Sequence, residues 1–187
     1  MKKDVKNKKI AVFGSLRIMV LCSAFVAISI VCGKYLAIRG GDVLRFSFEN
    51  MPIILAGIAF GPVAGAAVGI VADLIGCFLV GYAINPIITV AGGLIGAIGG
   101  LMYHLCRKLP LWACTAITVT ACHITGSVLV KTVGLAAFYS MPLWELMLWR
   151  LLNYVIIGIA EGFLIYVLLK NKAFRKQLMI NRKEDTQ

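Results

Sequence analysis

The stretch RIMVLCSAFVAISIVCGKYLA, residues 17–37, decides what kind of protein this chain forms. No charged residue interrupts it between Arg17 and Lys34. A run of about 20 apolar residues is long enough to cross the hydrocarbon core of a bilayer as a helix. The basic residues before it are also typical of a signal peptide, but no small-x-small cleavage site follows near Lys34, and further apolar runs come later. We therefore predict that residues 17–37 form a first membrane helix that is retained.

The whole chain has the composition of an integral membrane protein. Of its 187 residues, 60% are hydrophobic and 14% are charged, and the mean hydropathy is +0.91. Soluble domains average about 45–50% apolar and about 25% charged residues. The net charge of +11 does not indicate nucleic-acid binding, because the basic residues gather beside the apolar runs, as in the positive-inside pattern of membrane proteins. The six cysteines form no CxxC pair and are expected to pack as small apolar side chains.

Six apolar segments divide the chain. We predict an all-α membrane protein with one domain over residues 1–187, made of a basic tail (1–15), a six-helix bundle (16–170) and a second basic tail (171–187). The predicted helices are residues 17–37, 48–60, 62–80, 87–106, 112–138 and 142–169. Residues 38–47 are predicted to form a polar loop, and Gly61-Pro62 separates the second helix from the third, because proline favours the first turn of a new helix.

The basic residues predict the orientation of the bundle. Both tails are basic, and Arg107 and Lys108 occupy the connection expected on the same side as the tails. The positive-inside bias makes this side cytoplasmic, so both termini are predicted to be cytoplasmic. Five further basic residues map to the opposite rim, namely Lys34, Arg39, Arg45, Lys131 and Arg150. Since these five have no role in orientation, we interpret them as contacts for an anionic ligand.

Ionisable residues inside the apolar segments need a partner or a cavity, because an isolated charge in a bilayer is costly. Asp73 continues a stripe of glycines at four-residue spacing and so faces other helices, either as a ligand contact or as the partner of a buried cation. Lys131 shares a helical face with His123, for which a packed, hydrogen-bonded role is the alternative to ligand binding. Arg150, with Asn153 beside it, either lines a cavity or extends to the membrane interface.

Two loops add candidate contacts at the same rim. An arginine beside Phe46, with a Gly-Gly pair as a hinge, suits a flat anionic ligand, although a solvated loop is the alternative. The loop at 81–86 adds a tyrosine ring and an amide. The predicted substrate contacts, from helices and loops together, are Lys34, Arg39, Arg45, Phe46, Glu49, Asp73, Tyr82, Asn85, Lys131, Tyr139, Arg150 and Asn153. They would suit a molecule that is planar at one end and carboxylated at the other.

The sequence argues against an enzyme. It contains no HExxH, GxSxG or Walker A motif and no acidic motif able to hold a divalent metal. An enzyme acting on anionic lipid is the distant alternative, and it would need clustered Asp or His near the cytoplasmic headgroups. That side offers His104 beside Arg107 and Lys108, with no acidic cluster.

Three stretches carry a family resemblance. They are RFSFENMPIILAG (45–57), FGPVAG (60–65) and ADLIG (72–76). They are similar to the substrate-binding S components of energy-coupling factor (ECF) vitamin transporters. The stretch YAINPIIT (82–89), together with Arg150 and Glu161, looks most like the folate-specific (FolT-like) branch.

This resemblance implies partners and a location. The implied protein has six membrane helices, an outward-facing pocket, and partners that power uptake: a transmembrane coupling protein and two cytoplasmic ATPases. It needs no cofactor of its own, because only the partner subunits use ATP. In the family an alanine motif on the first helix docks onto the coupling protein, and here Ser23 and Ala27 stand at its two positions. The resemblance also implies a multi-pass protein of the cell membrane, in a Gram-positive-type bacterium.

Folate agrees with the chemistry of the predicted contacts. Its pterin ring can stack on aromatic side chains, and the two carboxylates of its glutamate tail need cations. Other vitamins or heterocycles stay open, namely riboflavin, thiamine or a queuosine precursor. Thiamine is itself cationic and fits poorly beside five basic residues. A queuosine precursor lacks the dicarboxylate tail and would leave the excess of cations unexplained.

Overall fold

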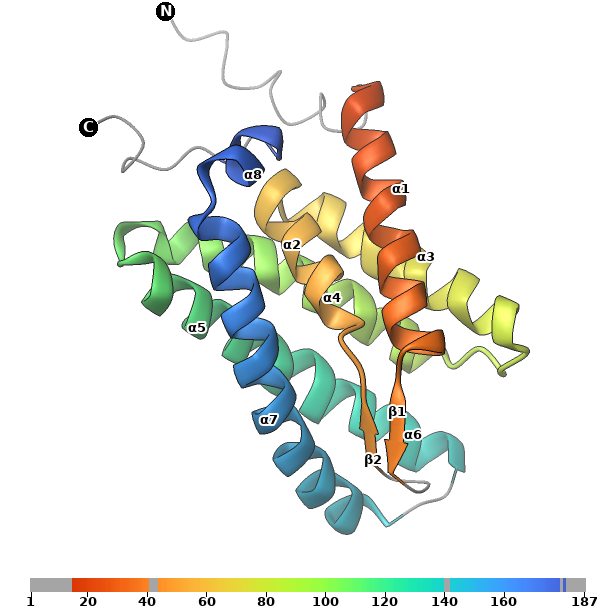
Figure 1. Ribbon diagram of the computed structural model, residues 1–187. Coiled ribbons are helices and arrows are strands. Elements are labelled where there is room, and N and C mark those ends of the chain that lie inside the picture. The colour runs from red at the N-terminus through yellow and green to blue at the C-terminus, as the bar shows by residue number, and fades with distance from the viewer. Residues whose placement is uncertain (1–14, 41–43, 140–141, 179, 181–187) are drawn as a thin grey trace, which may run out of the picture.

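The computed structural model describes residues 15–40, 44–139, 142–178 and 180, which form a bundle of helices (Figure 1). The long elements are α1 (Leu16–Ile30), α2 (Asn50–Phe60), α3 (Pro62–Val80), α4 (Pro86–Leu105), α5 (Leu111–Cys122), α6 (Lys131–Tyr139) and α7 (Leu143–Lys170). Two π-helical segments continue them, η1 (Val31–Tyr35) after α1 and η3 (His123–Val130) between α5 and α6. The shorter elements are β1 (Ile38–Gly40), β2 (Leu44–Phe46), η2 (Cys106–Lys108) and α8 (Lys172–Gln177).

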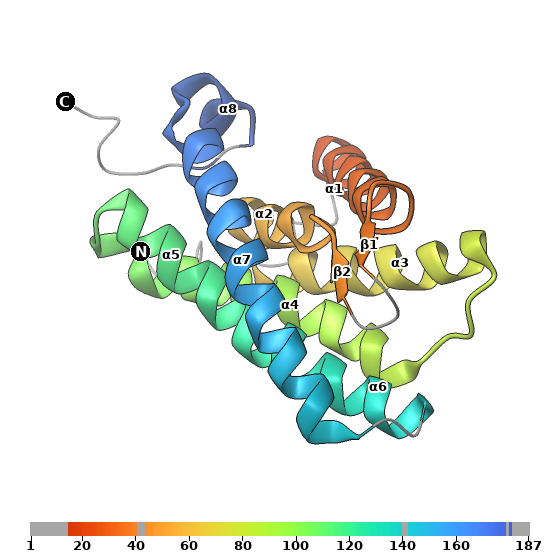
Figure 2. The ribbon, with the colours of Figure 1, turned by 60° about the horizontal axis from the view of Figure 1, so that its bottom comes forward.

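Five helices of the described chain are long and apolar enough to cross a membrane. They are Leu16–Tyr35, Pro62–Val80, Pro86–Lys108, Leu111–Phe138 and Leu143–Lys170. The prediction of a helical membrane protein is confirmed to this extent. The segment predicted as a further crossing is α2, whose 11 residues are fewer than the about 20 that a straight span needs. Most of α2 is buried, and in both views it lies among the other helices (Figures 1 and 2). Six crossings and cytoplasmic termini stay predictions.

Glycines set the contact between α2, α3 and α4. A Cβ atom added to Gly96 would overlap the backbone of Gly65, and one added to Gly69 would overlap the backbone of Gly92. A Cβ atom on Gly57 would likewise meet the carbonyl of Gly96. The three helices can approach this closely because no side chain separates their backbones. This half of the bundle is therefore held by direct backbone contact.

The connection at 38–47, predicted to be a polar loop, contains a short antiparallel hairpin. β1 and β2 pair so that Arg39 lies opposite Arg45. Each strand has only three residues, too few for the alternation that identifies a strand in a sequence. The hairpin lies at the end of the bundle where α7 begins, opposite the end that carries α8 (Figure 1).

Part of the segment predicted as the second basic tail is helical. The side chain of Asn171 accepts hydrogen bonds from the backbone at the start of α8 and caps it. Leu178 and Ile180, which follow α8, are buried in the main apolar core. Arg17 at the start of α1 donates a hydrogen bond to the carbonyl of Gln177 (3.1 Å). The C-terminal segment thus covers this end of the bundle.

Candidate binding site

A polar cavity of about 190 Å³ lies where η1, α3, α6 and α7 converge beside the hairpin. Predicted contacts that line it are Lys34, Glu49, Asp73, Tyr82, Asn85, Lys131, Arg150 and Asn153. The described residues also form a larger cavity, but apolar side chains line almost all of it. Because convergent polar groups mark a binding site better than size alone, the polar cavity is the candidate site.

The other predicted contacts lie elsewhere or outside the described part. Phe46 is described and does not line the cavity, whereas the neighbouring Ser47 does. The side chains of Arg39, Arg45 and Tyr139 are outside what the structure describes. The lining residues beyond the predicted contacts are Ser47, Cys77, Ala83, Ile88, Leu135 and Tyr154.

Lys131, the first residue of α6, is buried and paired. Its Nζ lies 2.8 Å from Oε1 of Glu49 and donates to Oδ1 of Asn50 at 3.3 Å. The backbone carbonyl of Glu49 accepts a hydrogen bond of 2.7 Å from Ser29 on α1. A buried ammonium is stable only when it is paired, and this pair joins α6 to the start of α2 and to α1. Glu49 therefore balances the charge of Lys131 in the described chain.

Arg150 on α7 has hydrogen-bond partners but no balancing charge among the described residues. Its Nη2 donates to the carbonyl of Ser127 (3.1 Å) and to the hydroxyl of Tyr154 (3.2 Å). The guanidinium also lies over the Tyr154 ring, 5.2 Å from its centre. The Nε of Arg150 is buried without a hydrogen-bond partner in the described structure. A guanidinium in this state can accept a carboxylate without first breaking an ion pair.

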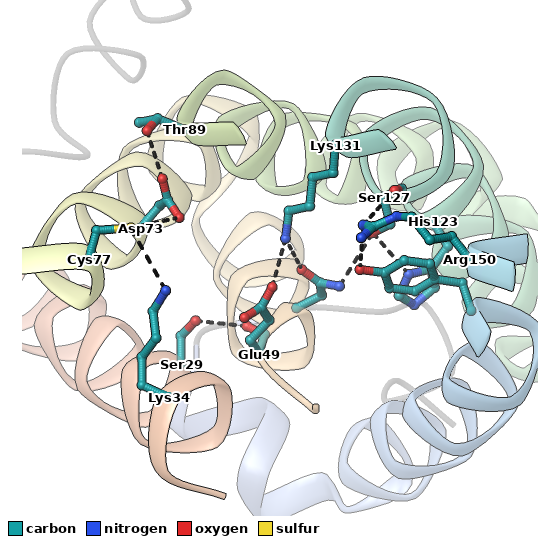
Figure 3. Close-up of polar contacts among 12 residues, drawn as sticks. Ser29, Lys34, Glu49, Asp73, Cys77, Thr89, His123, Ser127, Lys131 and Arg150 are labelled. Atoms are coloured by element: carbon teal, nitrogen blue, oxygen red, sulfur yellow. Dashed lines mark hydrogen bonds and ion pairs between the residues drawn. The ribbon is translucent and has the colours of Figure 1, made fainter. Parts of the chain in front are cut away.

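Asp73 and Lys34 form a second polar group across the cavity (Figure 3). Oδ2 of Asp73 accepts a hydrogen bond of 2.6 Å from the hydroxyl of Thr89, and its Oδ1 lies 3.8 Å from the thiol of Cys77. Nζ of Lys34 lies 3.8 Å from the same sulfur and 5.5 Å from the centre of the Tyr82 ring. The carboxylate of Asp73 is thus held by the neutral side chains of Thr89 and Cys77. The ammonium of Lys34 contacts the same thiol but forms no direct ion pair with Asp73.

Asn85 lines the cavity but its amide serves the fold. Its Oδ1 accepts from the backbone N of Ile87 and caps α4, and its Nδ2 donates to the carbonyl of Gly134 (2.8 Å). Asn85 is one of the ligand contacts predicted from the sequence. The geometry gives it the local role of tying the start of α4 to α6.

A chain of polar contacts leads from the cavity into the bundle. Asn50 donates to the hydroxyl of Ser127 (3.4 Å), which in turn contacts Nδ1 of His123 (3.3 Å). Nε2 of His123 lies 2.9 Å from Oε2 of Glu161, and the carboxyl of Glu161 is fully buried. The His123 ring stacks on the ring of Tyr154, with centres 5.2 Å apart. His123 is therefore packed and hydrogen-bonded, which was one of the two alternatives for it.

The described lining is positively charged overall. It holds three cations and two carboxylates, namely Lys34, Lys131 and Arg150 with Glu49 and Asp73. Such a lining attracts anions, and Tyr82 and Tyr154 add ring faces for a flat ligand. In the described part of the chain, no group of three or more His, Cys, Asp or Glu side chains is placed to hold a metal ion.

The predicted docking residues lie away from this cavity. Ser23 and Ala27 are both exposed on α1, and the hydroxyl of Ser23 donates to the backbone carbonyl of Met19 (3.0 Å). The serine hydroxyl is thus satisfied within its own helix. This face of α1 can contact another apolar helix without leaving a polar group unpaired.

Comparison with known proteins places these features in one family. Residues 17–178 match the family described as the ECF transporter substrate-specific component. A solved structure of FolT bound with folic acid has a TM-score of 0.71 to this chain at 24% identity, over 84% of this chain and 96% of that one. A solved S-component for biotin from an ECF-type ABC transporter gives 0.60 at 20% identity, over 86% of this chain and 94% of that one. At these identities the structures show a shared fold. No curated protein matches the chain.

Proposed function

The chain belongs to the family of ECF transporter substrate-specific components, and on this premise we propose that it binds folate outside the cell for uptake. Family membership makes it a substrate-binding component for a vitamin-type molecule rather than an enzyme. The finer assignment to folate draws on the lining of the polar cavity and on the folate-bound neighbour.

The observation that carries the proposal is the unbalanced charge of Arg150. Its guanidinium reaches the cavity, lacks a carboxylate partner among the described residues and keeps a buried Nε without a hydrogen bond. We assign to it one carboxylate of the glutamate tail, held by a charge-assisted hydrogen bond from the guanidinium. Lys131, whose ammonium is shared with Glu49 and Asn50, lies on the same side and can turn toward the second carboxylate.

The opposite side of the cavity suits the pterin ring. The amino and ring N–H groups of a pterin need a hydrogen-bond acceptor, and Asp73 supplies a carboxylate held in place by Thr89. Tyr82 offers a ring face beside it. In this arrangement the planar end of folate lies near α3, and the tail lies near α6 and α7.

The size of the cavity supports a second candidate. Its volume of about 190 Å³ is below the roughly 300–1,000 Å³ of sites that enclose drug-sized ligands. Folate would therefore have to extend toward the hairpin or widen the cavity. A smaller vitamin with one carboxylate, as biotin is, needs less room, and the second structural neighbour is an S-component for biotin.

Uptake would require partners and a defined orientation. We place the hairpin end of the bundle outside and the α8 end in the cytoplasm, following the basic residues at the α8 end. The coupling protein would dock on the Ser23–Ala27 face of α1, and two cytoplasmic ATPases would supply the energy.

A titration of the purified protein in detergent tests this function. Folate, biotin, riboflavin and thiamine are each added while calorimetric heat and tryptophan fluorescence are followed. Trp149 is adjacent to Arg150 and should respond to an occupied cavity. Saturable binding of folate, and not of thiamine, is the expected result. Binding of biotin in place of folate would replace the first candidate by the second. Protein that is folded but binds neither of these two carboxylated vitamins would contradict both.

A further inference from the structure

A second cavity of about 530 Å³ opens between α5, η3 and α7. In Figure 2, α5 and α2 lie on opposite sides of α7. One end of this groove is lined by Trp112 and Tyr166, and its middle is formed by His123 and Gly158. A Cβ atom added to Gly162 would meet no atom within 4 Å, so the lack of a side chain at this position leaves open space in the groove. The groove is open along its side and is not part of the polar cavity, although Tyr154 lines both.

The groove faces the lipid rather than water. Ile159 and Phe163 on its rim are 71% and 65% exposed, and both belong to a helix long and apolar enough to span the membrane. In a bilayer such side chains lie against acyl chains. A recess between them must be filled by hydrocarbon or by an apolar side of another protein, because water is absent at that depth.

The length of the groove suits an acyl chain. The residues from Trp112 to Val128 that line it span about 24 Å of helix. The distance from Trp112 to His123 is about 16 Å along the helix, close to half of the about 30 Å hydrocarbon thickness, so a chain from one leaflet would end near His123.

Basic residues lie at the end of the groove where a headgroup would be. Trp112 follows η2, which carries the exposed Lys108, and Lys170 ends α7 with its ammonium 5.9 Å from the centre of the Tyr166 ring. Lysines at a membrane surface attract anionic headgroups. We propose that the groove between α5 and α7 binds one anionic phospholipid, with an acyl chain between Trp112 and His123 and its phosphate against Lys108 and Lys170.

Lipid retention tests the site directly. The protein is purified in detergent with equal amounts of palmitoyl-oleoyl phosphatidylglycerol and phosphatidylcholine, and bound lipid is counted by native mass spectrometry. We expect one retained phosphatidylglycerol per chain. Gly162→Leu fills the groove without a backbone clash and should abolish retention of either lipid. The double variant Lys108→Gln/Lys170→Gln should keep a lipid but lose the preference for phosphatidylglycerol, by about fivefold for each lysine removed.

Two matched controls separate the groove from general lipid adhesion. Val71→Leu enlarges an exposed residue on α3, outside the groove, and Lys176→Gln removes an exposed charge on α8. Both should retain lipid as the unchanged protein does. The proposal would be overturned if Gly162→Leu retained as much lipid as the unchanged protein. It would also be overturned if the unchanged protein showed no preference between the two lipids. Loss of the lipid on adding a coupling protein would overturn it as well and would make the groove a protein contact. Vitamin binding by the same samples is a separate readout, so the two proposals can fail independently.

Discussion

Different kinds of contact hold together two parts of this bundle, a first half made of α2, α3 and α4 and a second half made of α5, η3, α6 and α7. Between α2, α3 and α4, glycine backbones touch, and no side chain can be inserted without overlap. Between the α5–η3–α6 span and α7, contact runs through individual polar pairs and leaves an open groove. Backbone contact allows one arrangement only, whereas hydrogen bonds can be exchanged for those of a ligand. The polar cavity lies between the halves, with Asp73 on the first and Lys131 and Arg150 on the second.

The largest effect is expected from a side chain placed in the glycine contact. In Gly96→Leu the new side chain would overlap the backbone of Gly65 and of Ala66, which cannot move without separating α3 from α4. Overpacking of this kind destabilises by about 3 kcal/mol or more, so we expect little folded protein. Size-exclusion chromatography and thermal unfolding in detergent measure this. Gly162→Ala on α7, where nothing lies within 4 Å, is the matched control and should leave the unfolding temperature unchanged or slightly higher. Folded Gly96→Leu protein would remove the basis for the contrast between the halves.

The next effect concerns the buried pair of the second half. His123→Leu leaves the carboxyl of Glu161 buried without this hydrogen-bond partner, and we expect the free energy of unfolding to fall by about 1–3 kcal/mol. The double variant His123→Leu/Glu161→Leu removes both polar groups and should be more stable than the single variant. Denaturant unfolding of the three proteins measures the coupling. If the double variant is less stable than His123→Leu alone, the pair does not act as a unit.

The helices of both halves could be predicted from the sequence, but their contacts could not. The predicted 62–80 matches α3 at both ends, because Gly61-Pro62 and Gly81 mark them. The span predicted at 112–138 contains the π-helical η3, which hydropathy cannot distinguish from α-helix because both are equally apolar. The hairpin was missed because strands of three residues carry no pattern of their own.

The cavity could be predicted in outline for a physical reason. Lys131, Arg150 and Asp73 stand out because charges in apolar helices are costly, and all three line it. Asn50 and Thr89 were missed, since uncharged polar residues are common in membrane helices and give no such signal. The pairing of His123 with Glu161 depends on how α7 is rotated against η3, which a single sequence does not report.

A third prediction tests whether the second half supplies the charge that binds the substrate. Arg150→Gln should weaken vitamin binding by more than tenfold, about 1.4 kcal/mol. It should lower stability by only about 1 kcal/mol, because the hydrogen bonds to Ser127 and Tyr154 are lost but no described carboxylate loses its partner. Lys131→Gln should weaken binding similarly and also destabilise the protein, because the buried ion pair between Lys131 and Glu49 is lost. Calorimetry and thermal unfolding separate the two effects. Lys176→Gln on α8 is the control for a change in net charge. Unchanged affinity in both variants would refute the assignment of these cations.

The smallest effect is expected from Ser127→Ala. This variant tests whether the polar chain through Ser127 stabilises the second half or also contributes to substrate binding. Ser127→Ala removes a hydroxyl that accepts from Asn50 and contacts His123, so we expect a loss of about 1 kcal/mol in stability. The carbonyl of Ser127, to which Arg150 donates, is retained in alanine. Vitamin affinity should therefore change much less than in Arg150→Gln, and the two variants measured side by side by calorimetry give the comparison. If Ser127→Ala weakens binding as much as Arg150→Gln does, the polar chain positions the cations of the cavity, and the second half binds the substrate through its whole network rather than through Arg150.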